Sequence, residues 1–188
     1  MIETLIEIKD LSKVYKVNEN YLQALDNVSF TIDSGEIFSL LGANGAGKTT
    51  LSSIVASLHP PTSGDIFFKG KSIYKDILSY RMALGYCPQK PNLDPYLNVE
   101  QNLIFAGQYF LLPKNIIKER VEALLDYFDL QKYKKSGVHI LSRGYKQRLL
   151  LARSLIHNPK IVILDEPTVG LDPHFRRELW TKIKDLKS

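Results

Sequence analysis

The chain has 188 residues, of which 44% are hydrophobic and 24% are charged. These proportions are those of a globular domain of ordinary size, so they exclude a disordered or fibrous protein. The net charge of +5 is small beside 20 interspersed acidic residues, which argues against a protein that coats nucleic acid. One cysteine, Cys87, excludes an internal disulfide and any multi-cysteine metal site, and its apolar neighbours favour a buried strand position.

Targeting and membrane-spanning patterns are absent from the sequence as written. The first residues lack the basic and apolar regions of a secretory signal, and no apolar run approaches the roughly 18 residues that indicate a membrane span. We therefore expect a soluble chain that acts at a membrane only through a partner.

Strand patterns come first along the chain. Alternating polar and apolar residues predict strands at 4–9 and 28–32, with a polar loop at 16–21 between them. The apolar run 37–41 is too short for a helix and predicts a strand that leads into a glycine-rich segment. A helix pattern follows and ends before the prolines at 60–61, whose ring geometry blocks continuation.

The period of the apolar residues changes from two to 3.6 after Pro88. Strand candidates at 65–68 and 82–87 precede the change. Asn98, with Gln101 three residues later, then predicts a capped helix start. The helical stretch that begins here indicates a helical insertion in an α/β protein.

The last part of the chain returns to a strand and a helix. The β-branched run 161–164 is typical of a parallel strand covered on both faces. Asp172, followed by a proline, predicts the cap of a final helix. Alternating strands and helices around a glycine loop predict a parallel-sheet α/β core.

The segment GANGAGKT at 42–49 matches the P-loop pattern G-x4-G-K-[ST]. Glycines let backbone N–H groups turn inward around an anion, and the following helix presents its positive end to the same phosphates. Lys48 can reach the β- and γ-phosphates of a nucleotide, and the Thr49 hydroxyl can ligate Mg²⁺. The alternative is a glycine-rich surface turn. The predicted phosphate-binding residues are Gly42, Asn44, Gly45, Ala46, Gly47, Lys48, Thr49 and Thr50.

Two later motifs carry further candidate residues. Asp165 can hold the Mg²⁺ shell and Glu166 can polarise an attacking water, because a parallel strand delivers its last residues to the ligand crevice. Alone, this pair would be read as a solvated turn. Ser142 is a natural N-cap, so its hydroxyl and the Gly144 amide would lie at a positive helix end. Without further information, that motif is a structural cap.

The order of these motifs closely resembles the nucleotide-binding domain of ATP-binding cassette (ABC) transporters. The P-loop is followed by Pro88-Gln89, Leu-Ser-x-Gly, Leu-Asp-Glu-Pro and Gly-Leu-Asp, and the match runs from about Thr4 to the last residue. The resemblance implies one domain, 1–188, with an α/β P-loop NTPase core, a parallel sheet and an N-terminal antiparallel β portion. Its core would comprise 1–89 and 158–188, and an inserted helical subdomain with the signature motif would span 90–157.

The resemblance also implies roles for single residues. Tyr15 would stack on adenine, and Gln89 would reach the Mg²⁺ and the attacking water. Ser142 and Gly144 would grip the γ-phosphate of ATP bound on a second, facing subunit, and Asp172 would lie across that dimer interface. Ordinary strand packing for Tyr15, a turn role for Gln89 and a helix cap at Asp172 are the alternatives. The implied catalytic residues are Glu166, Lys48 and Gln89, and the implied metal ligands are Thr49, Gln89 and Asp165.

The sequence departs from the family pattern in two places. In the usual signature Leu-Ser-Gly-Gly-Gln, Arg143 replaces the first Gly and Tyr145 replaces the Gln. The serine and the second glycine remain, so phosphate contact should survive, and the basic residue resembles the ABC-2 type exporter branch. The family also carries a switch histidine on a further strand, but only 16 residues follow Asp172. We therefore expect a cassette whose C-terminal part is missing and which, by itself, hydrolyses ATP weakly or not at all.

The resemblance predicts an ATP-binding and ATP-hydrolysing subunit that powers a separate membrane permease, most simply an exporter. Its cofactors would be ATP and Mg²⁺, and its partners the permease and a second nucleotide-binding subunit, with no nucleic acid. It would lie on the inner face of the cell membrane, held there by the permease. The alternatives are a soluble ABC-type ATPase not linked to transport and an ATP-binding dimerisation switch. A GTPase is disfavoured because the sequence holds no Asn-Lys-x-Asp motif.

Overall fold

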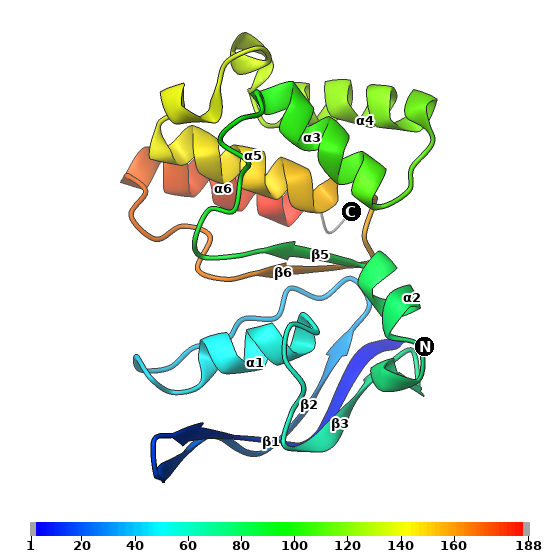
Figure 1. Ribbon diagram of the computed structural model, residues 1–188, viewed down its shortest axis with the longest axis vertical. Coiled ribbons are helices and arrows are strands. Elements are labelled where there is room, and N and C mark those ends of the chain that lie inside the picture. Colours follow the sequence, from blue (N-terminus) through cyan, green and yellow to red (C-terminus); the bar gives the residue numbers. More distant parts are fainter. Residues whose placement is uncertain (1–2, 186–188) are drawn as a thin grey trace. The chain divides into compact units, whose positions relative to one another are not determined.

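A computed structural model describes residues 3–185 of an α/β chain (Figure 1). The first two and last three residues of the predicted domain lie outside this range. The described elements form two compact units. The first comprises the residues up to Arg81 together with those from Ile183 onward, and the second comprises Met82–Lys182.

The first unit contains a four-stranded antiparallel sheet in the order β2-β1-β3-β4. This sheet confirms the predicted N-terminal antiparallel β portion. Its strands are β1 (Thr4–Val17), β2 (Asn20–Asp33), β3 (Ser63–Phe68) and β4 (Lys71–Ser72).

The hairpin between β1 and β2 is longer than the sequence pattern predicts. The predicted loop 16–21 is wrong, because Lys16 pairs with Tyr21 and Val17 with Asn20. The chain reverses within two residues, and Asn18 has a φ of 57°, a left-handed conformation that asparagine tolerates in tight turns. Polar side chains on an exposed hairpin do not prevent the backbone ladder from continuing.

Helices complete the first unit. Figure 1 shows α1 (Lys48–Val55) beside the sheet, where it buries Leu51 and Ile54. A short 3₁₀ turn, η1 (Ile73–Lys75), leads to α2 (Ile77–Met82). The hydroxyl of Tyr80 in α2 donates a hydrogen bond to the Val55 carbonyl at 2.7 Å. Tyr80 is 2% exposed, so this bond satisfies its buried polar group and fixes α2 against the end of α1.

The apolar run 37–41 does not form the predicted strand. It has no regular secondary structure and pairs with none of the described strands. Ile37 is 44% exposed, Phe38 39% and Leu41 93%. A strand is stable only where a neighbouring strand satisfies its backbone groups, so an apolar run alone does not specify one.

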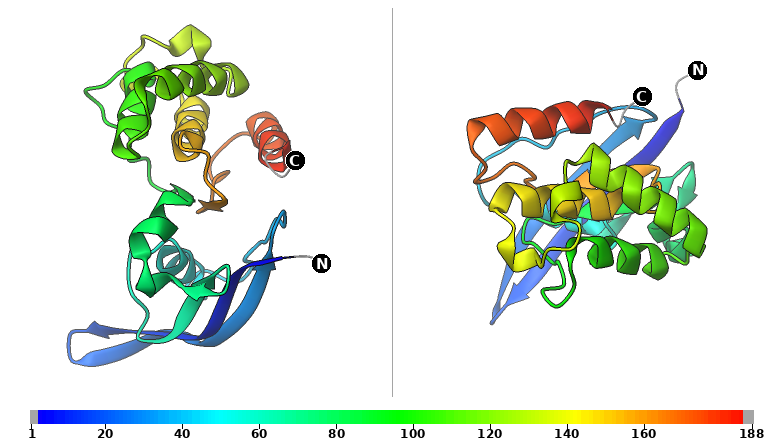
Figure 2. Two further views of the ribbon diagram at one scale, coloured as in Figure 1. Left: turned by 90° about the vertical axis from the view of Figure 1, so that its right-hand side faces the viewer. Right: turned by 90° about the horizontal axis from the view of Figure 1, so that it is seen from above.

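The second unit pairs β5 (Leu84–Cys87) with β6 (Ile161–Leu164) in parallel, which confirms the predicted parallel sheet. Its helices gather as a group in Figure 2. The side chains of β6 are half-exposed rather than covered on both faces, and within the described residues no third strand pairs with β5 or β6. The helical elements are α3 (Val99–Tyr109), α4 (Lys114–Tyr127), η2 (Gln131–Tyr133), η3 (Val138–Ile140), α5 (Arg143–Leu155) and α6 (Pro173–Asp185).

A glycine allows α5 to pack closely on the parallel pair. A Cβ atom built on Gly85 in β5 would lie 2.4 Å from the Ser154 carbonyl oxygen of α5, so a larger residue would separate the helix from the strand. Cys87, at the end of β5, is 0% exposed, which confirms its predicted buried strand position. Burial raises the pKa of Cys87 to about 12.

One buried arginine joins three helical segments of the second unit. Arg148 on α5 is 5% exposed. Its guanidinium forms ion pairs with Asp129, just after α4, and with Glu178 on α6. It also lies 5.4 Å from the ring centre of Tyr145 and 4.9 Å from that of Phe175. Since a buried charge is tolerated only when it is paired, the three segments are held as a set.

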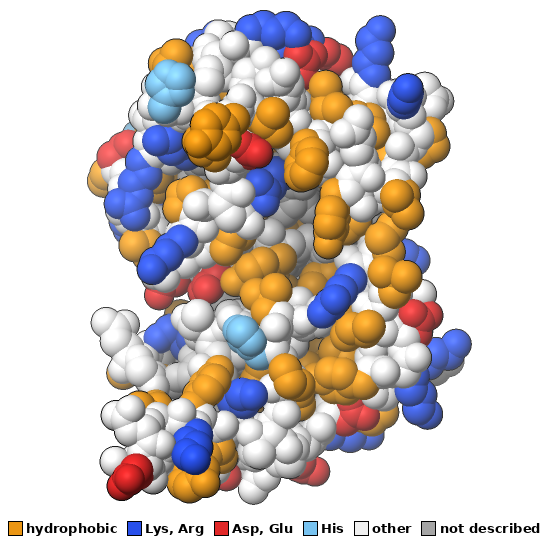
Figure 3. All heavy atoms as spheres, viewed as in Figure 1, with side chains coloured by type: hydrophobic (Ala, Val, Ile, Leu, Met, Phe, Trp, Pro, Cys, Tyr) orange, Lys and Arg blue, Asp and Glu red, His pale blue; other side chains and the backbone are white. Residues whose placement is uncertain are grey.

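Apolar side chains are exposed on and around α3. Figure 3 shows hydrophobic side chains gathered on this part of the surface. Tyr96 is 94% exposed, Phe105 60%, Tyr109 76% and Leu111 85%. Phe105 and Tyr109 lie four residues apart and therefore share one face of α3. Clusters of exposed apolar side chains of this kind mark surfaces that bind other molecules.

The capping box of α3 confirms the predicted helix start and can be tested by mutation. Asn98 Oδ1 accepts a hydrogen bond from the Gln101 backbone N–H at 2.8 Å, and Gln101 Oε1 accepts one from the Asn98 backbone N–H at 2.9 Å. We expect Asn98→Ala to lower the free energy of unfolding by about 1 kcal/mol, or roughly 2–4 °C in Tm. Thermal unfolding checks this against Gln108→Ala, a change at an exposed position on the same helix. Equal Tm values for the two variants would contradict the role of the cap.

Candidate functional site

The P-loop lies in the first unit, where the irregular segment that follows β2 enters α1. Gly45 and Gly47 have φ values of 84° and 86°, a region that glycine adopts without strain. A Cβ atom on Gly47 would lie 2.4 Å from the Ala24 carbonyl oxygen of β2, so only glycine fits at this point. The loop backbone can therefore turn directly into α1, whose first N–H groups are available to an anion.

Lys48 closes the loop on itself. Its Nζ donates hydrogen bonds to the carbonyl oxygens of Gly42 and Ala43, both at 2.8 Å. A lysine ammonium has three N–H donors, so one remains for a phosphate oxygen. Thr49, the next residue, is exposed at the start of the helix. The arrangement thus combines a fixed positive charge, a helix N-terminus and an accessible hydroxyl, as the sequence predicts.

Tyr15 occupies a strand position in the same unit. It pairs with Leu22 across the β1–β2 hairpin, and its side chain is half-buried. The Lys13 ammonium lies 5.2 Å from the centre of the Tyr15 ring and donates a hydrogen bond to the Pro60 carbonyl at 2.7 Å. The ammonium thus lies over the Tyr15 ring at a distance typical of a cation–π interaction. Adenine stacking by Tyr15 stays a prediction.

In the second unit, the parallel strands bring Gln89 and Glu166 together although 77 positions separate them. Gln89 follows β5 and Glu166 follows β6, and parallel strands end at the same edge of a sheet. The side-chain amide of Gln89 donates a hydrogen bond to Glu166 Oε2. Glu166 has a φ of 49°, a left-handed conformation that is uncommon for a glutamate.

Asp165 lies between β6 and Glu166 and is only 8% exposed. Its backbone N–H donates to the Cys87 carbonyl at 3.0 Å, which extends the parallel ladder by one residue. Burial raises the pKa of the Asp165 carboxyl, and the neighbouring charge of Glu166 raises it further.

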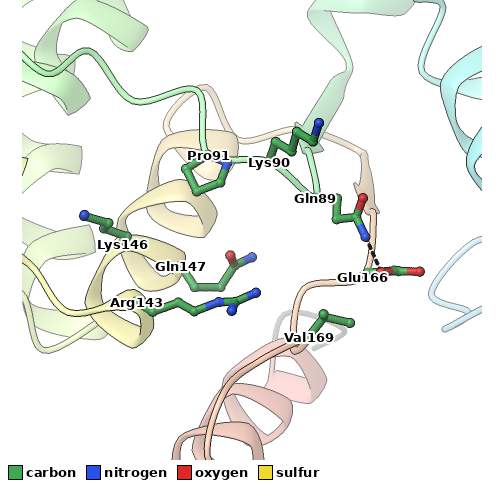
Figure 4. Close-up of a pocket in the computed structure, with 8 residues that line it drawn as sticks. All are labelled: Gln89, Lys90, Pro91, Arg143, Lys146, Gln147, Glu166 and Val169. Atoms are coloured by element: carbon green, nitrogen blue, oxygen red, sulfur yellow. Dashed lines mark hydrogen bonds between the residues drawn. The ribbon is translucent and has the colours of Figure 1, made fainter.

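A pocket of about 510 Å³ lies beside Glu166 (Figure 4). Three of its lining residues are cationic and one is a carboxylate, so positive charge predominates. The sequence reasoning did not identify Lys90, Lys146 or Gln147 as part of a site. The one available signal was that Lys146 and Gln147 fall on the first turns of the helix that begins at Arg143. The pocket is lined by Gln89, Lys90, Pro91, Arg143, Lys146, Gln147, Glu166 and Val169.

The signature serine and the aspartate before α6 both act as helix caps, as predicted. Ser142 Oγ accepts a hydrogen bond from the Tyr145 N–H at 3.5 Å. Asp172 Oδ1 accepts hydrogen bonds from the backbone N–H groups of His174 and Phe175, both at 3.1 Å. The proposed contacts of Ser142 and Asp172 with a facing subunit stay predictions.

Gly144 is buried against the ring of Phe175. A Cβ atom on Gly144 would lie 2.7 Å from Phe175 Cδ1, so this glycine is needed for packing within the chain. The predicted contact of Gly144 with a phosphate would use its backbone N–H. That contact therefore does not depend on how Gly144 packs against Phe175 and stays a prediction.

Residues 3–185 contain neither a cluster of metal-binding side chains nor a helix suited to cross a membrane. No group of three or more histidine, cysteine, aspartate or glutamate side chains in this range could hold a metal ion. No helix in the same range is both long and apolar enough to cross a membrane.

Comparison with protein families and curated proteins agrees with the motif order. A family model described as "ABC transporter" matches residues 25–169. "Nod factor export ATP-binding protein I" of Sinorhizobium fredii is 41% identical over 183 residues, which are 96% of this chain and 52% of that protein. The mouse "Glucosylceramide transporter ABCA12" is 37% identical over 182 residues, 96% of this chain and 7% of that protein. The chain therefore spans about half the length of the Nod factor export proteins that it matches.

Solved structures show the same likeness. The dimeric ATP-binding cassette MJ0796, in a post-hydrolysis state with ADP and Pi, matches with a TM-score of 0.89 and 27% identity over 98% of this chain and 83% of that one. The protein cbiO1 from Clostridium perfringens, part of the ABC transporter complex cbiONQ, matches with a TM-score of 0.85 and 32% identity, covering 98% of this chain and 74% of that one.

The raised pKa of Asp165 generates a prediction for stability. Its folded-state pKa lies above its unfolded value, so the folded chain binds more protons between the two values and ionisation of Asp165 opposes folding at neutral pH. We therefore expect Asp165→Asn to raise Tm at pH 7. The gain should shrink as the pH falls through the range in which the wild-type carboxyl is protonated.

Thermal unfolding of the chain without metal or nucleotide, at several pH values, checks this prediction. Asp126→Asn, a change at an exposed carboxylate on α4, serves as the control. A lower Tm for Asp165→Asn at pH 7 would show that the carboxylate stabilises the fold.

Proposed function

Because the chain belongs to the ABC transporter family, we propose that it binds ATP through its P-loop and, within the whole protein, hydrolyses ATP to drive a separate membrane permease. The observation that carries this proposal is the loop geometry around Lys48. Its ammonium donates to two loop carbonyls and retains one N–H for a phosphate oxygen. It lies at the start of a helix whose first backbone N–H groups are available to bind an anion.

Nucleotide binding would use two parts of the first unit. The loop amides and Lys48 would hold the phosphates as charge-assisted hydrogen-bond donors. Tyr15 would supply a flat apolar surface for adenine, with the Lys13 ammonium over its ring. The phosphate-binding residues are the P-loop set Gly42, Asn44, Gly45, Ala46, Gly47, Lys48, Thr49 and Thr50.

Hydrolysis would depend on the pair formed by Gln89 and Glu166. The Glu166 carboxylate would accept the proton of the attacking water, and the Gln89 amide would orient both groups. Glu166 is exposed and lines the pocket, so water can reach it. Lys48 would stabilise the charge that develops on the transferred phosphoryl group.

Mg²⁺ fits the donor set, which we propose to be Thr49, Gln89 and Asp165. Hydroxyl, amide and carboxylate oxygens are the hard ligands that this ion prefers, together with phosphate oxygens and waters. The strongest support is Asp165, whose buried carboxylate lies next to Glu166. A bound cation would reduce the repulsion between these two negative charges. When bound, the ion would neutralise charge on the phosphates.

The partners would be a second nucleotide-binding subunit and a membrane permease, and the chain would lie on the inner face of the membrane. Support comes from the relatives, one a dimer and one part of a transporter complex. An exporter is favoured by the likeness to Nod factor export proteins. The exposed apolar side chains around α3 offer a surface for a protein partner.

In the dimer, Ser142, Gly144 and Asp172 would face the second subunit's nucleotide. Within the chain, the domain would divide into a core of 1–89 and 158–188 and a helical subdomain of 90–157.

Loss of the P-loop lysine tests nucleotide binding. We expect Lys48→Ala to weaken Mg-ATP binding by about 10- to 100-fold, because a charge-assisted hydrogen bond to phosphate is lost. Isothermal titration calorimetry measures the affinity, with Lys75→Ala on η1 as a matched control for an exposed lysine of the same unit. An unchanged affinity in Lys48→Ala would overturn the assignment of the loop.

Replacing the candidate base tests hydrolysis separately from binding. We expect Glu166→Gln to keep ATP affinity, since the amide oxygen can still accept the Gln89 hydrogen bond. Turnover should fall by about 10²-fold or more, because the amide cannot take a proton from water. Phosphate release in the whole protein is the measurement, and gel filtration with ATP should show an accumulated dimer. Wild-type turnover in Glu166→Gln, with Glu119→Gln on α4 as the control, would exclude Glu166 as the base.

A further inference from the structure

The turn between β6 and α6, residues 166–172, carries two of the predicted functional residues. It begins at Glu166, which accepts the Gln89 hydrogen bond, and ends at Asp172, which caps α6. Two backbone hydrogen bonds between residues three positions apart shape the turn. One runs from Val169 N–H to the Glu166 carbonyl at 3.2 Å, and the other from Leu171 N–H to the Thr168 carbonyl at 3.3 Å. The two ends of the turn are thus fixed by side-chain contacts.

The middle of the turn is contacted by Arg143 from the start of α5. A Cβ atom built on Gly170 would lie 2.2 Å from Arg143 Nη1, 2.3 Å from Cζ and 2.6 Å from Nη2. The guanidinium therefore occupies the space in which any other residue at position 170 would place its side chain. Gly170 also has a φ of 70°, a backbone conformation that favours glycine, and any side chain added at this position would displace the guanidinium.

The direction of the side chain agrees with this contact. In Figure 4, Arg143 extends from α5 toward Val169, whereas Lys146, from the same turn of the helix, points away. A guanidinium is planar and can lie flat against a backbone that bears no side chain, which an ammonium on a flexible stem cannot do equally well. The contact therefore uses the particular chemistry of arginine.

A second contact of α5 supports the same segment on the other side of Asp172. Phe175 lies against Gly144, and the rings of Tyr145 and Phe175 meet edge to face at 5.7 Å. Three successive residues of α5 thus touch the chain just before and just after Asp172. Arg143 is the one for which a contact with the turn leading back to Glu166 is described.

We propose that Arg143 is a positioning residue, which holds the turn 166–172 through Gly170 and so fixes Glu166 and Asp172. Arg143 stands where the usual signature has a glycine. In this proposal its side chain contacts a turn of the same chain and not a nucleotide. Its effect on turnover rests on the proposed function, but its effect on the turn does not.

Hydrogen exchange in the full chain without nucleotide tests the positional part. We expect Arg143→Ala to speed amide exchange in peptides covering residues 168–172 by about 3- to 10-fold, because local opening governs the exchange of such turns. Arg143→Lys should give an intermediate rate. Lys146→Ala removes the same charge from the same pocket and should leave this exchange unchanged. Equal exchange in Arg143→Ala and wild type, or an equal increase in Lys146→Ala, would overturn the proposal.

A double-mutant cycle between Arg143→Ala and Gly170→Ala tests the consequence for catalysis. Gly170→Ala introduces backbone strain in both backgrounds, but it displaces the guanidinium only where Arg143 is present. We therefore expect Gly170→Ala to lower kcat by a larger factor in the wild type than in Arg143→Ala, whereas additive effects would contradict the contact. Arg143→Ala alone should lower kcat about 3- to 10-fold with KM for ATP nearly unchanged.

The two experiments separate the two claims. Absence of ATPase activity in the whole protein of wild-type sequence would refute the proposed function, and hydrogen exchange would still decide the role of Arg143. A raised KM with unchanged exchange in Arg143→Ala would instead show that Arg143 meets the nucleotide, which overturns the proposal while leaving the proposed function intact.

Discussion

The packing of the second unit depends on the pairing of one buried charge. The Arg148 guanidinium is removed from water, so it is stable only while Asp129, Glu178 and two aromatic rings surround it. Asp129 follows α4, Glu178 and Phe175 lie on α6, and Tyr145 lies on α5 itself. Breaking one ion pair would therefore loosen the helix that carries the signature residues and the helix that Asp172 caps. The same cluster includes one departure from the family signature, because the Tyr145 ring lies 5.4 Å from the Arg148 guanidinium.

Local features of the fold could be predicted from the sequence because each of them depends on residues a few positions apart. The capping box at Asn98, the cap at Ser142 and the P-loop turn into α1 belong to this group. The run 37–41 shows the limit of such reasoning, since a strand requires a partner that an apolar pattern does not contain. The hairpin at 16–21 shows the reverse, because a continuous ladder overrides polar composition.

The candidate site divides in the same way. The P-loop residues and the Asp165–Glu166 pair follow from motifs, whereas their surroundings do not. The pairing of Gln89 with Glu166 spans 77 positions, and the partners of Arg148 lie 19 and 30 positions away. Arg143 stood out in the sequence only as a departure from a pattern, and its contact with Gly170 depends on how α5 packs against a distant turn. Neither the spacing of apolar residues nor secondary-structure propensity predicts such a contact.

The burial of Cys87 has a practical consequence for studying the protein. It is the single cysteine of the chain, it is fully enclosed, and burial raises its pKa to about 12, so almost no thiolate exists at neutral pH. Thiol-reactive dyes and spin labels should therefore not react with Cys87. Cysteines introduced at exposed positions would be labelled without first removing Cys87. One such cysteine in each unit would therefore allow the distance between the two units to be measured.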